Sequence, residues 1–214
     1  MGELELLEQR WIALRAMAGQ KKMSKLELDE YWDEVHILSK KMAILRAKEH
    51  QELTEELEKI GIIINNIFDL VNTKIKYPKA IPILIKHLQK NYSEKIKEGI
   101  IRSLTVIEAK GKAVPILVNE YLKIPKDNES IRWAIGNAVN VTITKEEAEL
   151  IFPIVLNKGN GLSRQMFVAA LGKINTEKVR EILKQLLNDE DKVISEEAQK
   201  ALKKLEKKNL PKNT

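Results

Sequence analysis

The chain has 214 residues, of which 43% are hydrophobic, 32% are charged and 5% are aromatic, with only 6 prolines and 9 glycines. This composition, dominated by Leu, Ile, Lys and Glu, favours helices and disfavours a β-sandwich, which needs more turn residues. The absence of cysteine excludes disulfides, thiolate catalysis and Cys-based zinc sites, and it suits a cytoplasmic location.

Charge divides the chain into two parts. Residues 1–75 contain 11 basic and 14 acidic residues, whereas residues 76–214 contain 26 basic and 17 acidic ones. A strongly basic second part indicates either an acidic partner or a lysine-rich surface that serves solubility. The longest apolar stretches, near Ile60 and Ile81, are too short to span a bilayer, so no membrane association is expected.

Apolar residues in the first part recur at helical spacing. They predict one helix up to about Gly19, a second that starts at a capping Ser24, and a third set from Leu53 to Val71 in steps of four and three. We expect residues 1–75 to form a helical cap on the domain that follows, or a hairpin that dimerises. The chain is accordingly expected to be a monomer or a weak dimer.

Four segments in the second part share one helical pattern over twelve positions. They start at Ile96, Ile131, Ser163 and Ile194, so that successive starts lie 35, 32 and 31 residues apart. A period of this length is typical of repeat proteins. A second apolar helix, marked by Pro82, Pro115 or Pro153, precedes each of the first three segments. Pro153 lies deeper in its segment and is expected to kink or restart the helix.

The stretch from Arg164 to Gly172, Arg-Gln-Met-Phe-Val-Ala-Ala-Leu-Gly, resembles the second helix of a HEAT repeat. The resemblance covers about residues 77–207 and implies an all-α fold, a right-handed α-solenoid of about four HEAT-like helix pairs behind an N-terminal helical cap. The expected divisions are a cap at 1–75, a repeat domain at 76–208 with units at about 77–110, 111–143, 144–175 and 176–207, and a tail at 209–214.

The resemblance also suggests roles for the positions along the second helices. In HEAT-like repeats the basic residue at the second position pairs with an acidic or carbonyl group of a neighbouring unit, which gives Lys97, Arg132 and Arg164 a structural role. The second helices are expected to line a concave binding face. The exposed positions on that face are predicted to be Glu98, Arg102, Thr105, Trp133, Asn137, Asn140 and Gln165.

Trp133 stands out on this predicted face because the equivalent positions of the other repeats carry a charge or an amide. Trp133, Asn137 and Asn140 lie on one helical stripe, where an aromatic residue flanked by amides is typical of an interface anchor. The alternative is that Trp133 fills a gap between repeats. Our leading hypothesis is therefore a non-enzymatic scaffold that binds an acidic protein partner around Trp133.

Nucleic acid is the alternative partner. Residues 76–126 hold 11 basic and 4 acidic residues, and Lys95, Arg102, Lys110 and Lys112 are the candidate basic patch. A family of alkylpurine DNA glycosylases is also built from HEAT-like repeats, and this chain resembles that family in architecture and charge. In such a protein Trp133 of this chain would be the candidate stacking residue. No catalytic role is assigned, because the sequence contains no recognisable catalytic, phosphate-binding or metal-binding motif. No cofactor and no metal are expected.

Overall fold

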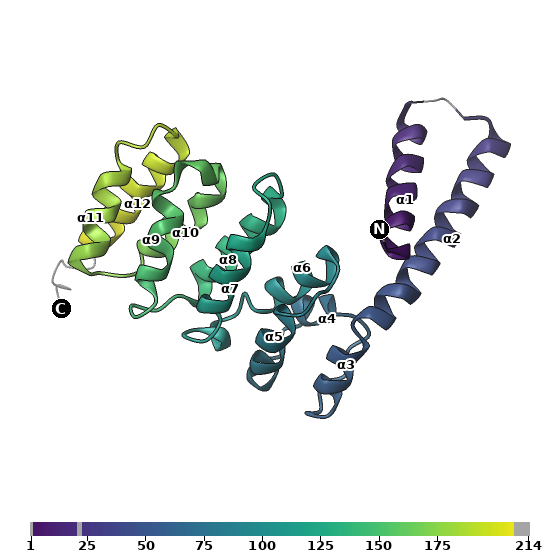
Figure 1. Ribbon diagram of the computed structural model, residues 1–214, viewed down its shortest axis with the longest axis horizontal. Coiled ribbons are helices and arrows are strands. Elements are labelled where there is room, and N and C mark those ends of the chain that lie inside the picture. Colours follow the sequence, from purple (N-terminus) through teal and green to yellow (C-terminus); the bar gives the residue numbers. More distant parts are fainter. Residues whose placement is uncertain (1, 21–22, 208–214) are drawn as a thin grey trace. The chain divides into compact units, whose positions relative to one another are not determined.

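The computed structural model describes residues 2–20 and 23–207 (Figure 1). The described residues form twelve α-helices and four short 3-10 helices, with no strand among them, which confirms the all-helical prediction. None of the described helices is both long and apolar enough to cross a membrane. The chain forms two compact units, Met1–Glu56 and Leu57–Thr214, whereas the sequence placed the end of its N-terminal segment at residue 75.

The N-terminal unit is built on a helical hairpin. Helices α1 (Glu3–Gln20) and α2 (Lys25–Glu49) pack against each other and are followed by α3 (Gln51–Glu58), which crosses the unit boundary. The predicted cap at Ser24 is confirmed: the Ser24 hydroxyl accepts from the Glu27 amide at 3.4 Å, and the Ser24 amide donates to the Glu27 carboxylate at 2.9 Å. This reciprocal pair satisfies two amides that the first turn of a helix leaves unpaired.

The apolar spacing from Leu53 to Val71 does not mark one continuous helix. Helix α3 ends at Glu58, and α4 (Phe68–Asn72) starts ten residues later. Between them Gly61 adopts a positive φ of 81°, which favours glycine, and the Asp69 carboxylate accepts amide protons from Asn65 and Asn66. These side-chain hydrogen bonds hold the backbone in a loop where the apolar pattern alone would allow a helix.

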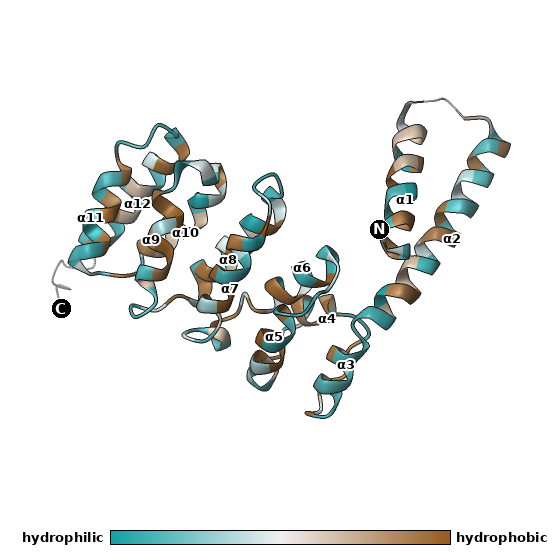
Figure 2. Cartoon of the chain, in the orientation of Figure 1, coloured by the Kyte–Doolittle hydropathy of each residue, from teal (hydrophilic) through white to brown (hydrophobic). Residues whose placement is uncertain are grey.

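The C-terminal unit continues as four successive helix pairs (Figure 1). The pairs are α5 (Ile81–Leu88) with α6 (Glu94–Ser103), α7 (Val114–Lys123) with α8 (Glu129–Thr142), α9 (Phe152–Leu156) with α10 (Gln165–Leu171), and α11 (Glu177–Leu186) with α12 (Lys192–Lys207). The second helices contact one another in order, α6 with α8, α8 with α10, and α10 with α12. Figure 2 shows the apolar residues concentrated on the first helices α5, α7 and α9.

Short 3-10 helices join or introduce these pairs. They are η1 (Pro78–Ala80), η2 (Ile107–Ala109), η3 (Ala148–Ile151) and η4 (Lys158–Arg164). The predicted helix restart at Pro153 is confirmed, because η3 ends and α9 begins immediately before this proline. Proline is tolerated there because the first turn of a helix leaves its amides unpaired.

Side-chain caps start two helices of the C-terminal unit. The Asn128 side chain accepts from the Ile131 amide at 3.4 Å, and the Thr176 hydroxyl accepts from the Val179 amide at 3.2 Å. Ser93 occupies the corresponding position before α6, but its side chain makes no capping hydrogen bond. The segment expected to stay helical as far as Ile107 ends earlier, since α6 stops at Ser103.

Glycine sets the spacing between the second helices. A Cβ at Gly136 of α8 would lie 2.9 Å from the Met166 Cβ of α10, and one at Gly172 would lie 2.9 Å from the Ala201 Cβ of α12. Such distances are shorter than carbon–carbon contact, so neither neighbour has room for a methyl group. The close approach of α8, α10 and α12 therefore depends on these two glycines.

We predict that Gly136→Ala lowers the free energy of unfolding by about 1–2 kcal/mol, because overpacking outweighs the better helix propensity of alanine. Gly19→Ala is the matched control, since a Cβ there meets nothing within 4 Å in α1. Urea denaturation of both variants measures the difference. An unchanged stability of Gly136→Ala would show that α8 and α10 are not closely packed at this point.

Candidate functional site

A row of basic side chains links each pair to the next, and we call Lys97 of α6, Arg132 of α8 and Arg164, which immediately precedes α10, the cation ladder. Arg164 is only 2% exposed. Its guanidinium forms a two-pronged ion pair with Asp189, with Nη1–Oδ2 at 2.7 Å and Nη2–Oδ1 at 3.0 Å. It also donates to the carbonyl oxygen of Val155 at 3.3 Å. This geometry joins the third pair to the loop between α11 and α12 of the fourth.

The other two members of the ladder also donate hydrogen bonds to the helix pair that follows their own. Arg132 donates to the Tyr121 hydroxyl at 2.6 Å and to the Asn160 side-chain oxygen of the next pair at 2.7 Å. Lys97 of α6 donates to the buried carboxylate of Glu120 on α7 at 3.1 Å. The predicted pairing with an acidic group of a neighbouring unit is therefore confirmed for Lys97 and Arg164. Arg132 binds the side-chain amide oxygen of Asn160 in the neighbouring unit in place of a carboxylate.

The Arg164–Asp189 pair makes stability depend on pH. Hydrogen bonds from Arg164 hold the pKa of Asp189 below its ordinary value, although burial acts in the opposite direction. The unfolded-state pKa of an aspartate is about 3.9. Since the folded-state value is lower, the stabilising contribution is present above the unfolded value and is lost as the pH falls through the folded one.

We predict that Arg164→Met lowers the free energy of unfolding by about 3–5 kcal/mol at pH 7, because it leaves the Asp189 carboxylate buried without its cation. The difference from the wild type should shrink as the pH is lowered towards 4, where Asp189 of the variant becomes protonated. Urea denaturation at several pH values measures both effects.

Arg180→Met is the matched control for this variant, because Arg180 donates to Asn175 and to the carbonyl of Leu205 but forms no ion pair among the described residues. Its loss should cost less and should not depend on pH in this range. Equal effects of the two variants would contradict a special role of the buried ion pair.

Trp133 follows the ladder residue Arg132 and points to solvent. Its side chain is 42% exposed, whereas Arg132 and Ala134 on either side of it are buried. The alternative in which Trp133 fills a gap between repeats would leave little of the ring accessible. One residue corresponds to a rotation of about 100° around a helix, so burying Arg132 against the next pair turns Trp133 outwards. The indole therefore lies on an accessible face of α8.

The two amides of the predicted stripe are less available than Trp133. Asn137 and Asn140 are both half-buried. The backbone carbonyl of Asn140 accepts from the Lys173 ammonium, while its side-chain oxygen is shielded from solvent and has no hydrogen-bond partner among the described residues. A shielded acceptor without a donor is costly, by about 1–3 kcal/mol. This shielding could not be predicted from the helical pattern, because it depends on how α8 packs against its neighbours.

Glu98 and Arg102 belong to one charge cluster on α6. Arg102 donates to the Glu98 carboxylate at 2.8 Å, and the Lys95 ammonium lies 3.6 Å from the other oxygen of that carboxylate. Lys95 also lies 4.7 Å from the centre of the Phe68 ring. One carboxylate thus faces two cations, so the cluster keeps a single net positive charge.

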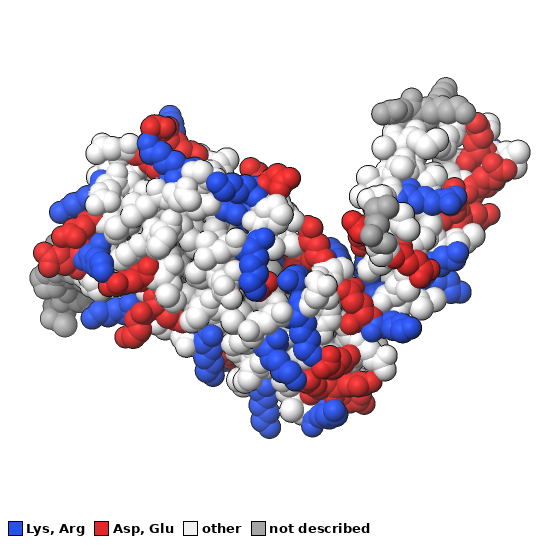
Figure 3. Space-filling view, in the orientation of Figure 1, with Lys and Arg blue, Asp and Glu red and all other residues white. Residues whose placement is uncertain are grey.

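The four residues of the predicted basic patch do not share one environment. Lys95 and Arg102 are paired with Glu98, whereas Lys110 and Lys112 are exposed between η2 and α7 and form no ion pair in the described part of the chain. Figure 3 shows that basic and acidic side chains both occur over the visible face of the C-terminal unit. Such a mixture gives a weaker field for a phosphate backbone than a row of unpaired cations.

Two further residues of the predicted face lie at helix ends. Thr105 follows the end of α6, and its hydroxyl donates to the carbonyl of Ile101 at 3.1 Å. It therefore does not continue the helical stripe, because α6 stops two residues earlier. Gln165 is half-buried as the first residue of α10. The accessible centre of the face is therefore Trp133, with the Glu98 cluster on the adjacent helix α6.

A separate cavity of about 360 Å³ lies near the start of the C-terminal unit and is lined by the loop after α3 and by Asp69, Lys76 and Tyr77. Its polar groups are already engaged, since Asp69 accepts backbone amides and the Tyr77 hydroxyl donates to the carbonyl of Ser103 at 2.9 Å. Burial raises the pKa of Tyr77 to about 12, so its phenol stays protonated at neutral pH. These groups hold the loop in place and do not form an acid–base pair.

Comparisons with models of protein families, with curated proteins and with solved structures found no match to the chain. The function is therefore inferred from the geometry of its own residues.

Proposed function

We propose that residues 76–208 form a right-handed α-solenoid of about four HEAT-like helix pairs and act as a non-enzymatic scaffold for a protein partner. Two observations support the repeat architecture. The second helices contact one another in chain order. The cation ladder repeats one inter-pair contact at equivalent positions. In this proposal the second helices line a concave face, and the scaffold works in the cytoplasm.

The exposure of Trp133 is the observation that carries the proposal. A tryptophan buries a large apolar area when a partner covers it, and tryptophan is enriched among the residues that dominate binding energy. Buried neighbours fix the helix on which it stands, so the ring is presented on a rigid element. A rigid aromatic anchor loses little conformational entropy on binding.

The charge cluster on α6, the helix that precedes α8 in the row of second helices, favours an acidic partner. The cluster of Lys95, Glu98 and Arg102 on α6 carries one net positive charge, and α6 packs directly against α8. A carboxylate of the partner placed over this cluster would meet a cation already held in position. Complementary charge of this kind raises the association rate and selects among partners.

We predict that Trp133→Ala weakens partner binding at least about thirtyfold, the effect of losing an interface anchor worth about 2 kcal/mol. The melting temperature should change little, since the side chain is exposed. Affinity capture from the native cell with wild type and variant side by side, followed by calorimetry on the captured protein, measures the effect.

Leu150→Ala is the matched control, because Leu150 is 43% exposed and lies on η3 rather than on a second helix. It should bind the partner like the wild type. Unchanged binding by Trp133→Ala, or a loss of more than about 4 °C in its melting temperature, would contradict the proposed site.

Nucleic acid remains the second candidate because Lys110 and Lys112 are exposed without ion pairs in the described part of the chain. A glycosylase would also need a carboxylate beside the stacking aromatic. Glu98 lies on α6, whereas Trp133 lies on α8, and the Glu98 carboxylate is already paired with Lys95 and Arg102. Titration of labelled duplex DNA at 50 and 200 mM salt separates the candidates. We expect weak binding, and tight binding that falls about a thousandfold between the two salt concentrations would favour nucleic acid instead.

A further inference from the structure

The hairpin of α1 and α2 leaves large apolar side chains exposed on more than one side. Only Leu38 and Met42 are buried in α2, and no described side chain of α1 is buried. The large apolar side chains that remain exposed on the two helices are Leu6, Ile12, Met17, Leu26, Leu28, Trp32, Ile37 and Ile44. Helices that are apolar around their circumference are normally covered on more than one side.

Part of this exposed surface forms a stripe on α2. Leu26, Ile37 and Ile44 are separated by 11 and 7 residues, which correspond to about three and two turns, so they lie on one face. Leu38 and Met42, which are buried in the hairpin, lie on a different side of the helix. The stripe therefore faces away from the hairpin's own core.

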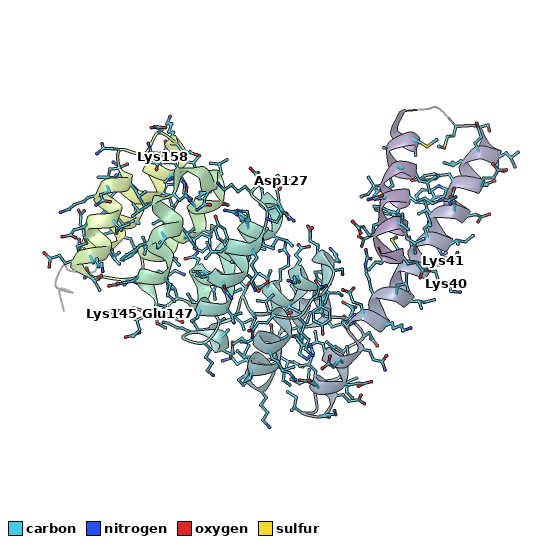
Figure 4. All side chains as sticks on the ribbon, in the orientation of Figure 1. Lys40, Lys41, Asp127, Lys145, Glu147 and Lys158 are labelled. Atoms are coloured by element: carbon cyan, nitrogen blue, oxygen red, sulfur yellow. The ribbon has the colours of Figure 1, made fainter. Side chains whose placement is uncertain are left out.

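The charges of α2 are divided along its length. The half before Ile37 is mostly acidic, with Glu27, Asp29, Glu30, Asp33 and Glu34 beside the single basic Lys25, and the half after it is mostly basic, with Lys40, Lys41, Arg46 and Lys48 beside the single acidic Glu49. Figure 3 shows this change from acidic to basic side chains along the hairpin, and Figure 4 shows Lys40 and Lys41 on the side of α2 that faces away from α1. Ile37 lies where the two halves meet.

We propose that α2 pairs in antiparallel orientation with α2 of a second copy of this chain, with the two-fold axis near Ile37. In this register residue numbers on opposite helices sum to about 74, so Asp33 of each copy lies across from Lys41 of the other. Leu26 meets the methylene stem of Lys48, and Ile44 lies near Glu30. A symmetric interface of this kind uses the same patch on both copies.

The charge pattern decides both the orientation and the occupant. Parallel pairing would place the acidic halves together and the basic halves together, which is unfavourable. A partner with charge of a single sign would match only one half of α2. A second copy in antiparallel orientation matches both halves and covers the apolar stripe between them.

Charge exchange tests this pairing in the full chain. Sedimentation velocity over a range of concentrations should show a dimer for the wild type. Asp33→Lys alone and Lys41→Asp alone should each raise the dissociation constant at least tenfold, and the double variant should restore it, because the pair is only reversed. Far-UV circular dichroism checks that each variant keeps its helices.

The matched control is Lys79→Glu with Lys145→Glu, two exposed positions of the C-terminal unit outside the hairpin. This variant should dimerise like the wild type. A wild type that is monomeric at every concentration would overturn the proposal. A dimer that both single charge variants leave unchanged would also overturn it, because the interface would then lie elsewhere.

Cross-linking gives an independent readout, since the natural chain contains no cysteine. Ile37→Cys places one thiol of each copy beside the two-fold axis, so a short bismaleimide should link the two chains rapidly. Ser39→Cys is the control, because Ser39 is also exposed on α2 but lies on another face. Equal cross-linking at the two positions would contradict the antiparallel register.

Discussion

The C-terminal unit depends on cations that are removed from water and bound across helix pairs. A guanidinium at the position of Arg164 is tolerated in the interior only because the Asp189 carboxylate and the Val155 carbonyl accept hydrogen bonds from it. Arg132 and Lys97 meet the same requirement with Asn160 and Glu120. Each contact fixes the distance and rotation of one pair relative to the next, and glycines at the helix contacts allow that distance to be short.

The candidate site follows from this constraint. Because Arg132 must point into the interior, the next residue in the helix must point away from it, and that residue is Trp133. The packing that buries Arg132 also shields the side-chain oxygen of Asn140 and so reduces the number of groups that a partner can reach. The accessible part of the predicted stripe is consequently one aromatic ring on α8, with a charge cluster on the neighbouring helix α6, and it is smaller than the stripe of three residues that helical geometry predicts.

Among the described residues of the N-terminal unit, no arginine or lysine is buried as Arg132 and Arg164 are. The hairpin of this unit is held by partly exposed ion pairs such as Arg46–Glu8 at 2.7 Å, and ion pairs that stay accessible to water stabilise only weakly. Two helices can bury one face each, so apolar residues on other faces stay exposed unless further chain covers them. Because one half of α2 is mostly acidic and the other mostly basic, two copies of α2 in antiparallel orientation place opposite charges across from each other.

Sequence alone determined the helical class, the pairing of helices in the second part and the helix starts at Ser24 and Pro153, whereas the inward role of the ladder cations was implied only by the resemblance of the segments to a known repeat. These features depend on local spacing, capping and charge, which neighbouring residues specify. Only the tertiary structure decided that the apolar pattern around Gly61 is a loop, that α6 stops before Thr105, and that Glu98 neutralises part of the basic patch. Those outcomes depend on side chains and backbone groups brought together by folding, and a one-dimensional pattern does not contain their distances.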